Sequence, residues 1–391
     1  MHLGRFQYVS WLIVDYFVSN QLLANFDQVA AQLQAYIAAP TVENSKTFRG
    51  SINVLLKVCS KTPLGHNTPS FQHIISDTGG GKYFGSGLEQ TLRDIFEKQS
   101  MTPAEMLVNL QKFRTQLGSY LDSITKISEE MNSLGVEYEE LESDEFEFGA
   151  MFPKELVGKT IANIEEELEH LNRLFKALNE MMGNGSTSPT VRSISSSWWQ
   201  FFLDLDYKQI AAITIAIERI VTLYKSNLEI QKLKRDADKI ELGPEFTVLI
   251  NQRIDEKLKA GMMEIAKEVR QKFQNNTDEE RCNELETQLR MELVHIAKRI
   301  NQGAAYEIRA GLPDKPKVLA ENLKEDPQAG IEHADAMQIY EEKNKIAAEI
   351  NDAGLRLSTA IEELSGETQL LTDYEKLTEI VQIKPNDIKN K

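Results

Sequence analysis

The chain has 391 residues, which at roughly 150 residues per domain predicts two or three folding units. Hydrophobic residues make up 41% and charged residues 27%, a composition that excludes a disordered or collagen-like chain. The formal net charge of −16 argues against nucleic acid as a partner, because the phosphate backbone would be repelled.

The expected compartment follows from the cysteine content and the hydrophobic runs. Cys59 and Cys282 are too few for a disulfide framework in a chain of this length, which favours a reducing environment. The most apolar stretches, residues 6–18 and 210–217, are shorter than the ~20 residues that a bilayer-spanning helix needs. We therefore expect a cytoplasmic protein without a membrane partner.

Residues 1–100 are predicted to form a helical region with a glycine-rich loop. The first amphipathic helix is expected to run to Ile37 and to end at Pro40. A second helix is predicted over residues 44–60, where apolar side chains recur at steps of three and four. Residues 61–87 are rich in glycine and proline and predict an irregular connection.

Two heptad-patterned helices dominate the predicted unit at residues 101–242. The first begins at a capping box made by Thr102 and Glu105, and its apolar residues alternate steps of three and four until Gly135. The second has the same spacing over residues 161–182. Because the two helices are close in sequence, we expect them to pack as an antiparallel coiled pair.

Between and after these helices the hydrophobic period changes from helical to two. Apolar residues alternate with glutamates within residues 136–152, and a second β-like stretch covers residues 190–203. A further helix is predicted to start at Asp206. The order helix, strand, helix, strand, helix predicts a mainly α fold with a small β-sheet (α+β), in which antiparallel heptad-patterned helices surround a short sheet.

The rest of the chain is predicted to be helical with one break. Residues 243–311 form a helical region that includes a capping box from Thr277 to Glu280. Residues 312–330 contain three prolines and read as a linker. Residues 331–391 are expected to form C-terminal helices.

The two apolar stripes and the tryptophans of the second β-segment are the candidate interaction surface. The segment at residues 129–180 holds 15 acidic and four basic residues, and its β-like part is expected to offer an acidic docking edge to a protein partner. The candidate interaction residues are Leu110, Phe113, Leu117, Tyr120, Ile124, Ile161, Leu168, Leu171, Phe175, Trp198 and Trp199.

Two Glu-x-x-His motifs suggest a metal site instead. Glu167 with His170 and Glu292 with His295 have the spacing that carboxylate-bridged di-iron bundles use. At 100° per residue, however, both histidines lie more than ~100° from the centres of their own apolar stripes. This direction favours solvated residues on the helix flanks.

Three weaker ligand patterns each have a simpler structural explanation. A structural cysteine, a flexible connection and a helix cap account for them without a ligand. The patterns are Cys59 with His66 and His73 for zinc, Gly79-Gly80-Gly81-Lys82 for an anion, and Asp204 with Asp206 for a divalent cation.

The leading hypothesis is a non-enzymatic protein that acts by binding a protein partner, by forming a homo-oligomer, or by both, without a cofactor. The competing hypothesis is a metal-dependent enzyme that uses the two Glu-x-x-His motifs. A bacterial or phage-associated accessory protein of unknown activity is a third hypothesis that the composition permits. No motif identifies a family.

Overall fold

The computed structural model describes residues 3–60, 68–96, 102–158, 160–196, 198–238, 244–315 and 327–365. The chain divides into two compact units, Met1–Glu140 and Leu141–Lys391, called unit 1 and unit 2 below. The described residues are mainly helical and contain one four-stranded antiparallel sheet. The predicted α+β class is therefore confirmed.

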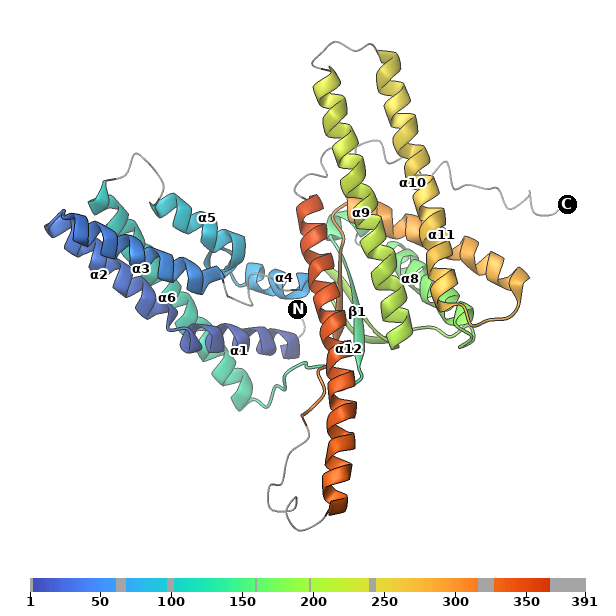
Figure 1. Cartoon of the computed structure of the whole chain (residues 1–391), viewed down its shortest axis with the longest axis horizontal. Coiled ribbons are helices and arrows are strands. Elements are labelled where there is room, and N and C mark those ends of the chain that lie inside the picture. Colours follow the sequence, from blue (N-terminus) through green and yellow to red (C-terminus); the bar gives the residue numbers. More distant parts are fainter. Residues whose placement is uncertain are drawn as a thin grey trace. The chain divides into compact units, whose positions relative to one another are not determined.

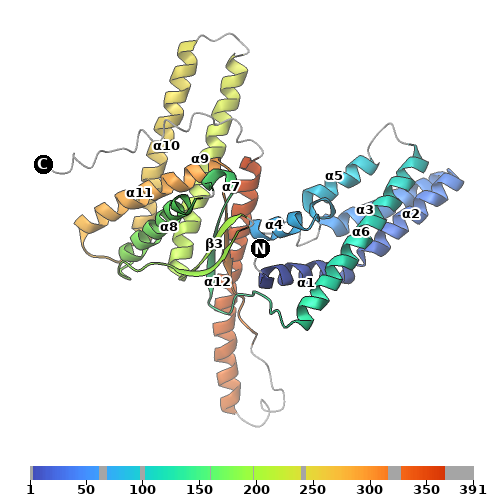
Figure 2. The same cartoon turned by 180° about the vertical axis from the view of Figure 1, so that it is seen from behind.

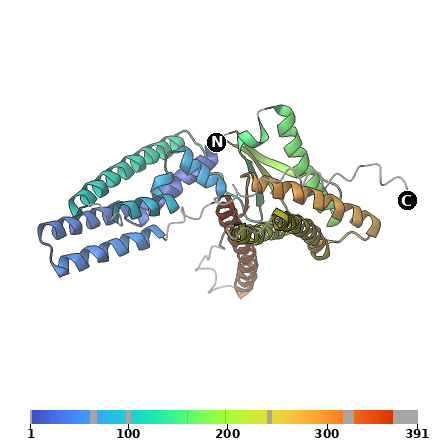
Figure 3. The same ribbon diagram turned by 90° about the horizontal axis from the view of Figure 1, so that it is seen from above.

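Unit 1 is helical, and its core lies between the long helix α6 and the helices that precede it (Figure 3). A single N-terminal helix was expected up to Ile37, but the chain breaks at Gln21, whose φ is 47°. The elements are α1 (Leu3–Ser19), α2 (Leu22–Ala38), α3 (Val42–Ser60), α4 (Pro69–Asp77), η2 (Gly81–Tyr83), α5 (Gly85–Phe96) and α6 (Pro103–Ser133).

The segment expected to be an irregular connection at residues 61–87 is partly helical. Pro69 occupies the first turn of α4, where its missing N–H is not needed. Gly80 packs so tightly that a Cβ atom there would lie 2.5 Å from the hydroxyl of Tyr120. Residues 61–67 lie outside the described part of the chain.

Helix α6 begins as predicted. The Thr102 hydroxyl accepts a hydrogen bond from the Glu105 N–H, and the Glu105 carboxylate accepts one from the Thr102 N–H at 2.8 Å. The apolar stripe of α6, including Leu110, Leu117 and Ile124, is buried in the core of unit 1, where α6 packs against α1 and α2.

Unit 2 combines one sheet with long helices (Figure 1), and the strand order of the sheet is β2-β3-β1-β4. The strands are β1 (Phe146–Phe152), β2 (Thr190–Ser195), β3 (Trp199–Leu205) and β4 (Ala305–Ala310). The helices are α7 (Lys154–Val157), α8 (Ile161–Met181), α9 (Tyr207–Asp238), α10 (Pro244–Phe273), α11 (Glu279–Asn301) and α12 (Pro327–Ser365).

The period-two pattern correctly located the central strand. β1 pairs antiparallel with both β3 and β4, and its alternate residues Phe148, Ala150 and Phe152 are buried in the helix-covered core. The rings of Phe148 and Phe175 are 5.3 Å apart. Residues 136–145, the other part of the predicted alternation, contain no strand.

Three further predictions about secondary structure need correction. The β-like stretch at residues 190–203 is a hairpin of β2 and β3 rather than one strand. The region at residues 243–311, expected to be entirely helical, ends in β4. At α11 the capping residue is Asp278, whose carboxylate accepts from the Arg281 N–H, and not Thr277. β4 was missed because six residues give too few repeats for a reliable period.

The acidic β-segment does not provide the predicted docking edge, because β1 is an interior strand. Its Glu147 is fully buried and accepts hydrogen bonds from Arg309 at 2.7 and 2.9 Å. Opposite Glu147 on β3, Asp204 accepts from Arg192 at 2.5 Å. The charges form a ladder across the four strands, from Arg192 through Asp204 and Glu147 to Arg309, so these two acidic side chains are paired within unit 2.

Helices protect and extend the rest of unit 2. Asn351 of α12 donates to the Ala310 carbonyl and accepts from its N–H, both at 2.9 Å, so α12 covers the edge strand β4. α9 and α10 run side by side as an antiparallel pair that extends beyond the sheet (Figures 1 and 2). α12 begins inside the predicted linker, of which residues 316–326 lie outside the described residues, as do residues 366–391.

The two heptad stripes have partners other than those predicted. The expected antiparallel pair of residues 110–134 and 161–182 is not what the structure describes, because α6 is buried within unit 1 while α8 packs on α11 in unit 2. Of the eleven predicted interaction residues, all of them described, Ile161 alone is exposed. The regular spacing predicted which helix faces are buried but not which helices cover those faces.

This assignment predicts that Leu117 and Phe175 are energetically independent. The effects of Leu117→Ala and Phe175→Leu on the free energy of unfolding should add to within about 0.5 kcal/mol in a double-mutant cycle. Phe148→Leu with Phe175→Leu is the matched control, and its coupling should reach about 0.5–3 kcal/mol because the rings touch. Coupling of 1 kcal/mol or more between Leu117 and Phe175 would contradict the assignment.

Candidate functional site

The candidate site lies between α8 and α11, which pack against each other along their length. α8 starts at Thr160, whose hydroxyl accepts from the Asn163 N–H. Apolar residues of both helices, such as Leu171 and Leu293, face the core of unit 2. Because both stripes point to one core, the flanks of the two helices face each other.

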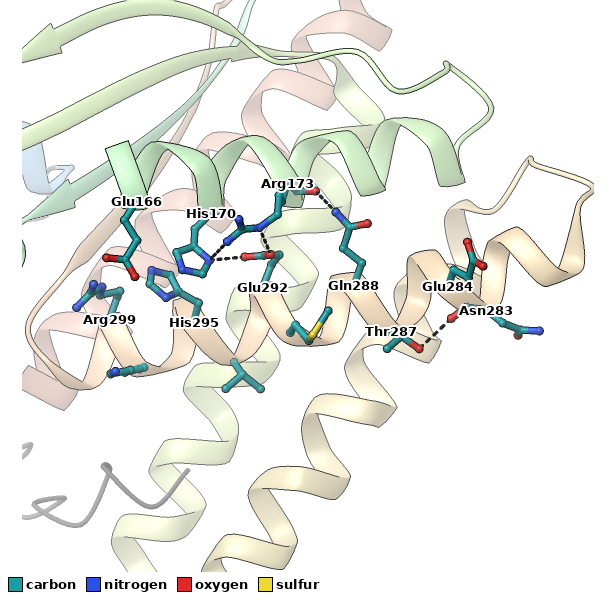
Figure 4. A pocket seen from close by; sticks show the side chains of 13 residues that line it. Glu166, His170, Arg173, Asn283, Glu284, Thr287, Gln288, Glu292, His295 and Arg299 are labelled. Carbon is teal, nitrogen blue, oxygen red and sulfur yellow. Dashed lines mark hydrogen bonds and ion pairs between the residues drawn. The ribbon is translucent and has the colours of Figure 1, made fainter. Parts of the chain in front are cut away.

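The two Glu-x-x-His motifs meet across this contact, and Figure 4 shows His170 of the first motif facing Glu292 and His295 of the second. His170 Nδ1 lies 2.6 Å from Glu292 Oε2, and His295 Nε2 lies 2.9 Å from Glu167 Oε2. Each histidine therefore bonds to the glutamate of the other helix. This reciprocal pairing is possible because the helices are antiparallel.

An arginine completes each pair. Arg173 Nε donates to Glu292 Oε1 at 2.8 Å, and Arg299 donates to Glu167 Oε1. Glu167 and Glu292 are 1% and 4% exposed, so these hydrogen bonds replace the water that burial removes. The six side chains, Glu167, His170, Arg173, Glu292, His295 and Arg299, are called the Glu-His-Arg cluster below.

The two imidazole rings stack on one another at the centre of the cluster. Their centroids are 3.6 Å apart and their planes are tilted by 15°. Because an ionised carboxylate only accepts hydrogen bonds, we assign the proton of His170 to Nδ1 and that of His295 to Nε2. With Nδ1 of His170 protonated, the Arg173 Nη2 that lies 2.9 Å from it is a close contact and not a hydrogen-bond donor to it. Within the described residues, the opposite nitrogen of each ring has no hydrogen-bond partner in the protein.

Burial and pairing shift the acidity of the cluster. Burial lowers the pKa of His295, an effect that the hydrogen bond to Glu167 opposes and the nearby His170 reinforces. Burial would raise the pKa of Glu167, but hydrogen bonds and charges from His295 and Arg299 hold it below its usual value. Beneath the cluster, burial raises the pKa of Tyr306, which keeps its hydroxyl protonated.

A groove of about 1060 Å³ opens over the cluster, along α11 and the facing side of α8. Figure 4 shows side chains of both helices turned toward this space. A second, much smaller cavity of about 10 Å³ lies under the rings and reaches Phe152 and Tyr306. That volume is at the lower limit for a single water molecule.

The prediction that the two histidines are solvated flank residues is wrong, because the flank of α8 faces the flank of α11. The metal hypothesis nevertheless lacks a ligand set, since no group of three His, Cys, Asp or Glu side chains in the described residues has a metal-binding arrangement. Zinc needs ligand nitrogens at ~2.0–2.1 Å, in the plane of each ring. Two rings stacked at 3.6 Å cannot both direct a lone pair to one ion.

The other candidate ligands are dispersed. Asp206 caps α9 by accepting from the Gln209 N–H at 2.9 Å, and Asp204 is paired in the charge ladder. Lys82 contacts Gln116 and lies 4.9 Å from the ring centre of Tyr83. Burial raises the pKa of Cys59 to about 12, which makes it a poor ligand, and its proposed partner His66 lies outside the described residues.

Arg173 and Arg299 are the site residues that the sequence analysis missed. They stand three residues after His170 and four after His295, so Glu-x-x-His followed by arginine occurs on both helices. In the sequence, the arginine one turn after each motif was the signal that the glutamates are paired with arginine.

The comparisons add nothing to the geometry. No protein-family model, no curated protein and no solved structure matches the chain. Among the described helices, none combines the length and the apolar character that crossing a membrane requires.

We expect unit 2 to lose stability in mild acid through His295. Burial lowers the pKa of His295 in the folded protein below its unfolded value of about 6.5. Below that pH the unfolded chain therefore binds more protons than the folded protein does. The stability of unit 2 that is present above this pH is lost as the pH falls. In a Trp11→Phe background the remaining tryptophans, Trp198 and Trp199, both report on unit 2. Their fluorescence should give a lower urea midpoint at pH 5.5 than at pH 7.5.

The matched control is His295→Asn, which removes the titrating group. Its urea midpoint should change less over the same pH range. An equal change in both proteins would show that His295 is not the group responsible.

Proposed function

We propose that this protein acts by binding another polypeptide, and that the groove between α8 and α11 receives it. The observation that supports this is the size and openness of the groove, which at about 1060 Å³ is as large as the largest small-molecule sites. Its α11 side runs from Asn283 to Arg299, roughly 24 Å at ~1.5 Å per residue. That length suits four or five turns of a partner helix.

The lining of the groove indicates what the partner segment carries. Met291, which is 41% exposed, and Val294 provide an apolar middle. Lys298 stands at one end, where Arg299 is paired with Glu167 and where Glu166 of α8 also lines the groove, and Glu284 stands at the other end. A segment with apolar residues at helical spacing and an acidic residue near Lys298 complements this pattern.

The Glu-His-Arg cluster fixes the helices that form the groove. Every carboxylate oxygen of Glu167 and Glu292 already accepts a hydrogen bond from a histidine or an arginine of the other helix, so both glutamates hold α8 against α11. Cys59 and Cys282 are free thiols, and a reducing cytoplasmic location is part of the proposal.

A photo-crosslinking residue in place of Met291 tests the proposal. In an extract of the native host it should crosslink to a polypeptide, or to a second copy of this chain if the partner is itself. The crosslink should be lost when Lys298→Glu and Val294→Asp are added. The same crosslinker at Glu280, exposed on α11 but outside the groove, should not capture this partner.

Identical capture from positions 291 and 280, or capture that survives both groove substitutions, would contradict the assignment of the groove. The partner is identified by mass spectrometry of the crosslinked peptide. A segment without apolar residues at helical spacing would contradict the proposed recognition.

A metal-dependent function is the second candidate, favoured by one observation. Each imidazole bonds through one nitrogen to a carboxylate and leaves the other nitrogen without a protein partner in the described residues, as metal-binding histidines do. Binding of one ion by both imidazoles would require the stacked rings of His170 and His295 to separate.

Elemental analysis of protein purified without added metal distinguishes the two candidates. Binding of a polypeptide alone predicts no stoichiometric transition metal. About two irons or manganeses per chain, lost in His170→Ala/His295→Ala, would support the metal-dependent function instead.

A further inference from the structure

Three aromatic rings lie together at the surface of unit 1, where Tyr8 also packs against the helical core through Phe71. Tyr8 and Trp11 are three residues apart on α1, and their ring centroids are 6.0 Å apart. Tyr138, from the segment after α6, places its ring 6.3 Å from Tyr8 and 5.9 Å from Trp11. Trp11 is 41% exposed and Tyr138 is 37% exposed, so much of this aromatic surface faces solvent.

Backbone contacts hold the three rings in place. The Glu139 N–H donates to the Gly4 carbonyl at 3.2 Å, and Arg5 donates to the Glu139 carboxylate at 2.8 Å. A Cβ atom at Gly4 would lie 2.9 Å from the Glu137 carbonyl, so glycine is needed for this close approach. The segment that carries Tyr138 is therefore fixed to the first turn of α1, and the rings are preorganised.

The charge beside the rings is negative. Glu137 and Glu140 are exposed on either side of Tyr138 in the chain. The guanidinium of Arg5 does not offset them at the surface, because its side chain is only 2% exposed and is paired with Glu139. Aromatic faces and nearby carboxylates both attract cations, and both become more effective when the cation is desolvated.

We propose that Tyr8, Trp11 and Tyr138, with Glu137 and Glu140, bind a lysine- or arginine-rich segment of a partner protein. The cationic side chain stacks on the exposed ring of Trp11 while the carboxylates contact neighbouring basic residues. Charge complementarity selects this partner, because an acidic peptide or an anionic membrane would be repelled by the same glutamates. The surface lies in unit 1 and does not depend on the groove of unit 2.

Fluorescence anisotropy with labelled hexa-arginine and hexa-lysine peptides tests the proposal on the full chain. The wild-type protein should bind both peptides in a salt-sensitive manner and should not bind hexa-glutamate. Trp11→Ala should weaken binding about fivefold, with Trp11→Phe in between, because a smaller ring retains part of the cation–π attraction. Since Trp11 is exposed, neither change should unfold the protein, which circular dichroism checks.

Matched charge variants separate the proposed surface from general attraction to an acidic protein. Glu137→Gln/Glu140→Gln should weaken binding about fivefold or more. Glu129→Gln/Glu130→Gln, which removes two exposed carboxylates from α6 in the same unit, should leave it unchanged. Equal effects of the two double variants, or no effect of Trp11→Ala, would overturn the proposal. Lys298→Glu should leave peptide binding unchanged, because the groove of unit 2 is not part of this surface.

Discussion

Two buried carboxylates impose the strongest constraint on unit 2. Removing an ionised carboxylate from water costs several kcal/mol unless hydrogen bonds and an opposite charge replace the solvent. For Glu167 and for Glu292 those partners stand on the other helix, in His295 with Arg299 and in His170 with Arg173. Both charges are satisfied only when α8 and α11 are antiparallel in one register. A shift by one helical turn would separate both pairs.

The same register creates the groove. The apolar stripes of α8 and α11 are buried in the core beside β1. The surface between the two helices is therefore lined by the side chains of their polar flanks. Charge pairs also form on the other side of the sheet, where Arg309 neutralises the buried Glu147 and Arg192 neutralises the half-buried Asp204.

The two proposed surfaces have different chemistry. The groove combines an apolar middle at Met291 with a cationic end at Lys298, whereas the patch around Trp11 combines aromatic rings with carboxylates. A helical acidic segment suits the first and a basic segment suits the second. The two proposals therefore assign a different class of partner to each unit.

The sequence by itself determined the local elements: the cap of α6 at Thr102, the alternation of β1 and the Glu-x-x-His spacing on two helices. Each depends on neighbours within about a turn, which a periodic pattern records. Only the tertiary structure decided which surfaces meet. A stripe of leucines specifies that a helix face is buried but not which helix it packs against. The sequence analysis therefore paired α6 with α8, which was wrong. The solvent exposure of Glu167, His170, Glu292 and His295 was likewise predicted from each helix alone. The flanks of two helices become buried, however, when the helices pack side by side on one core.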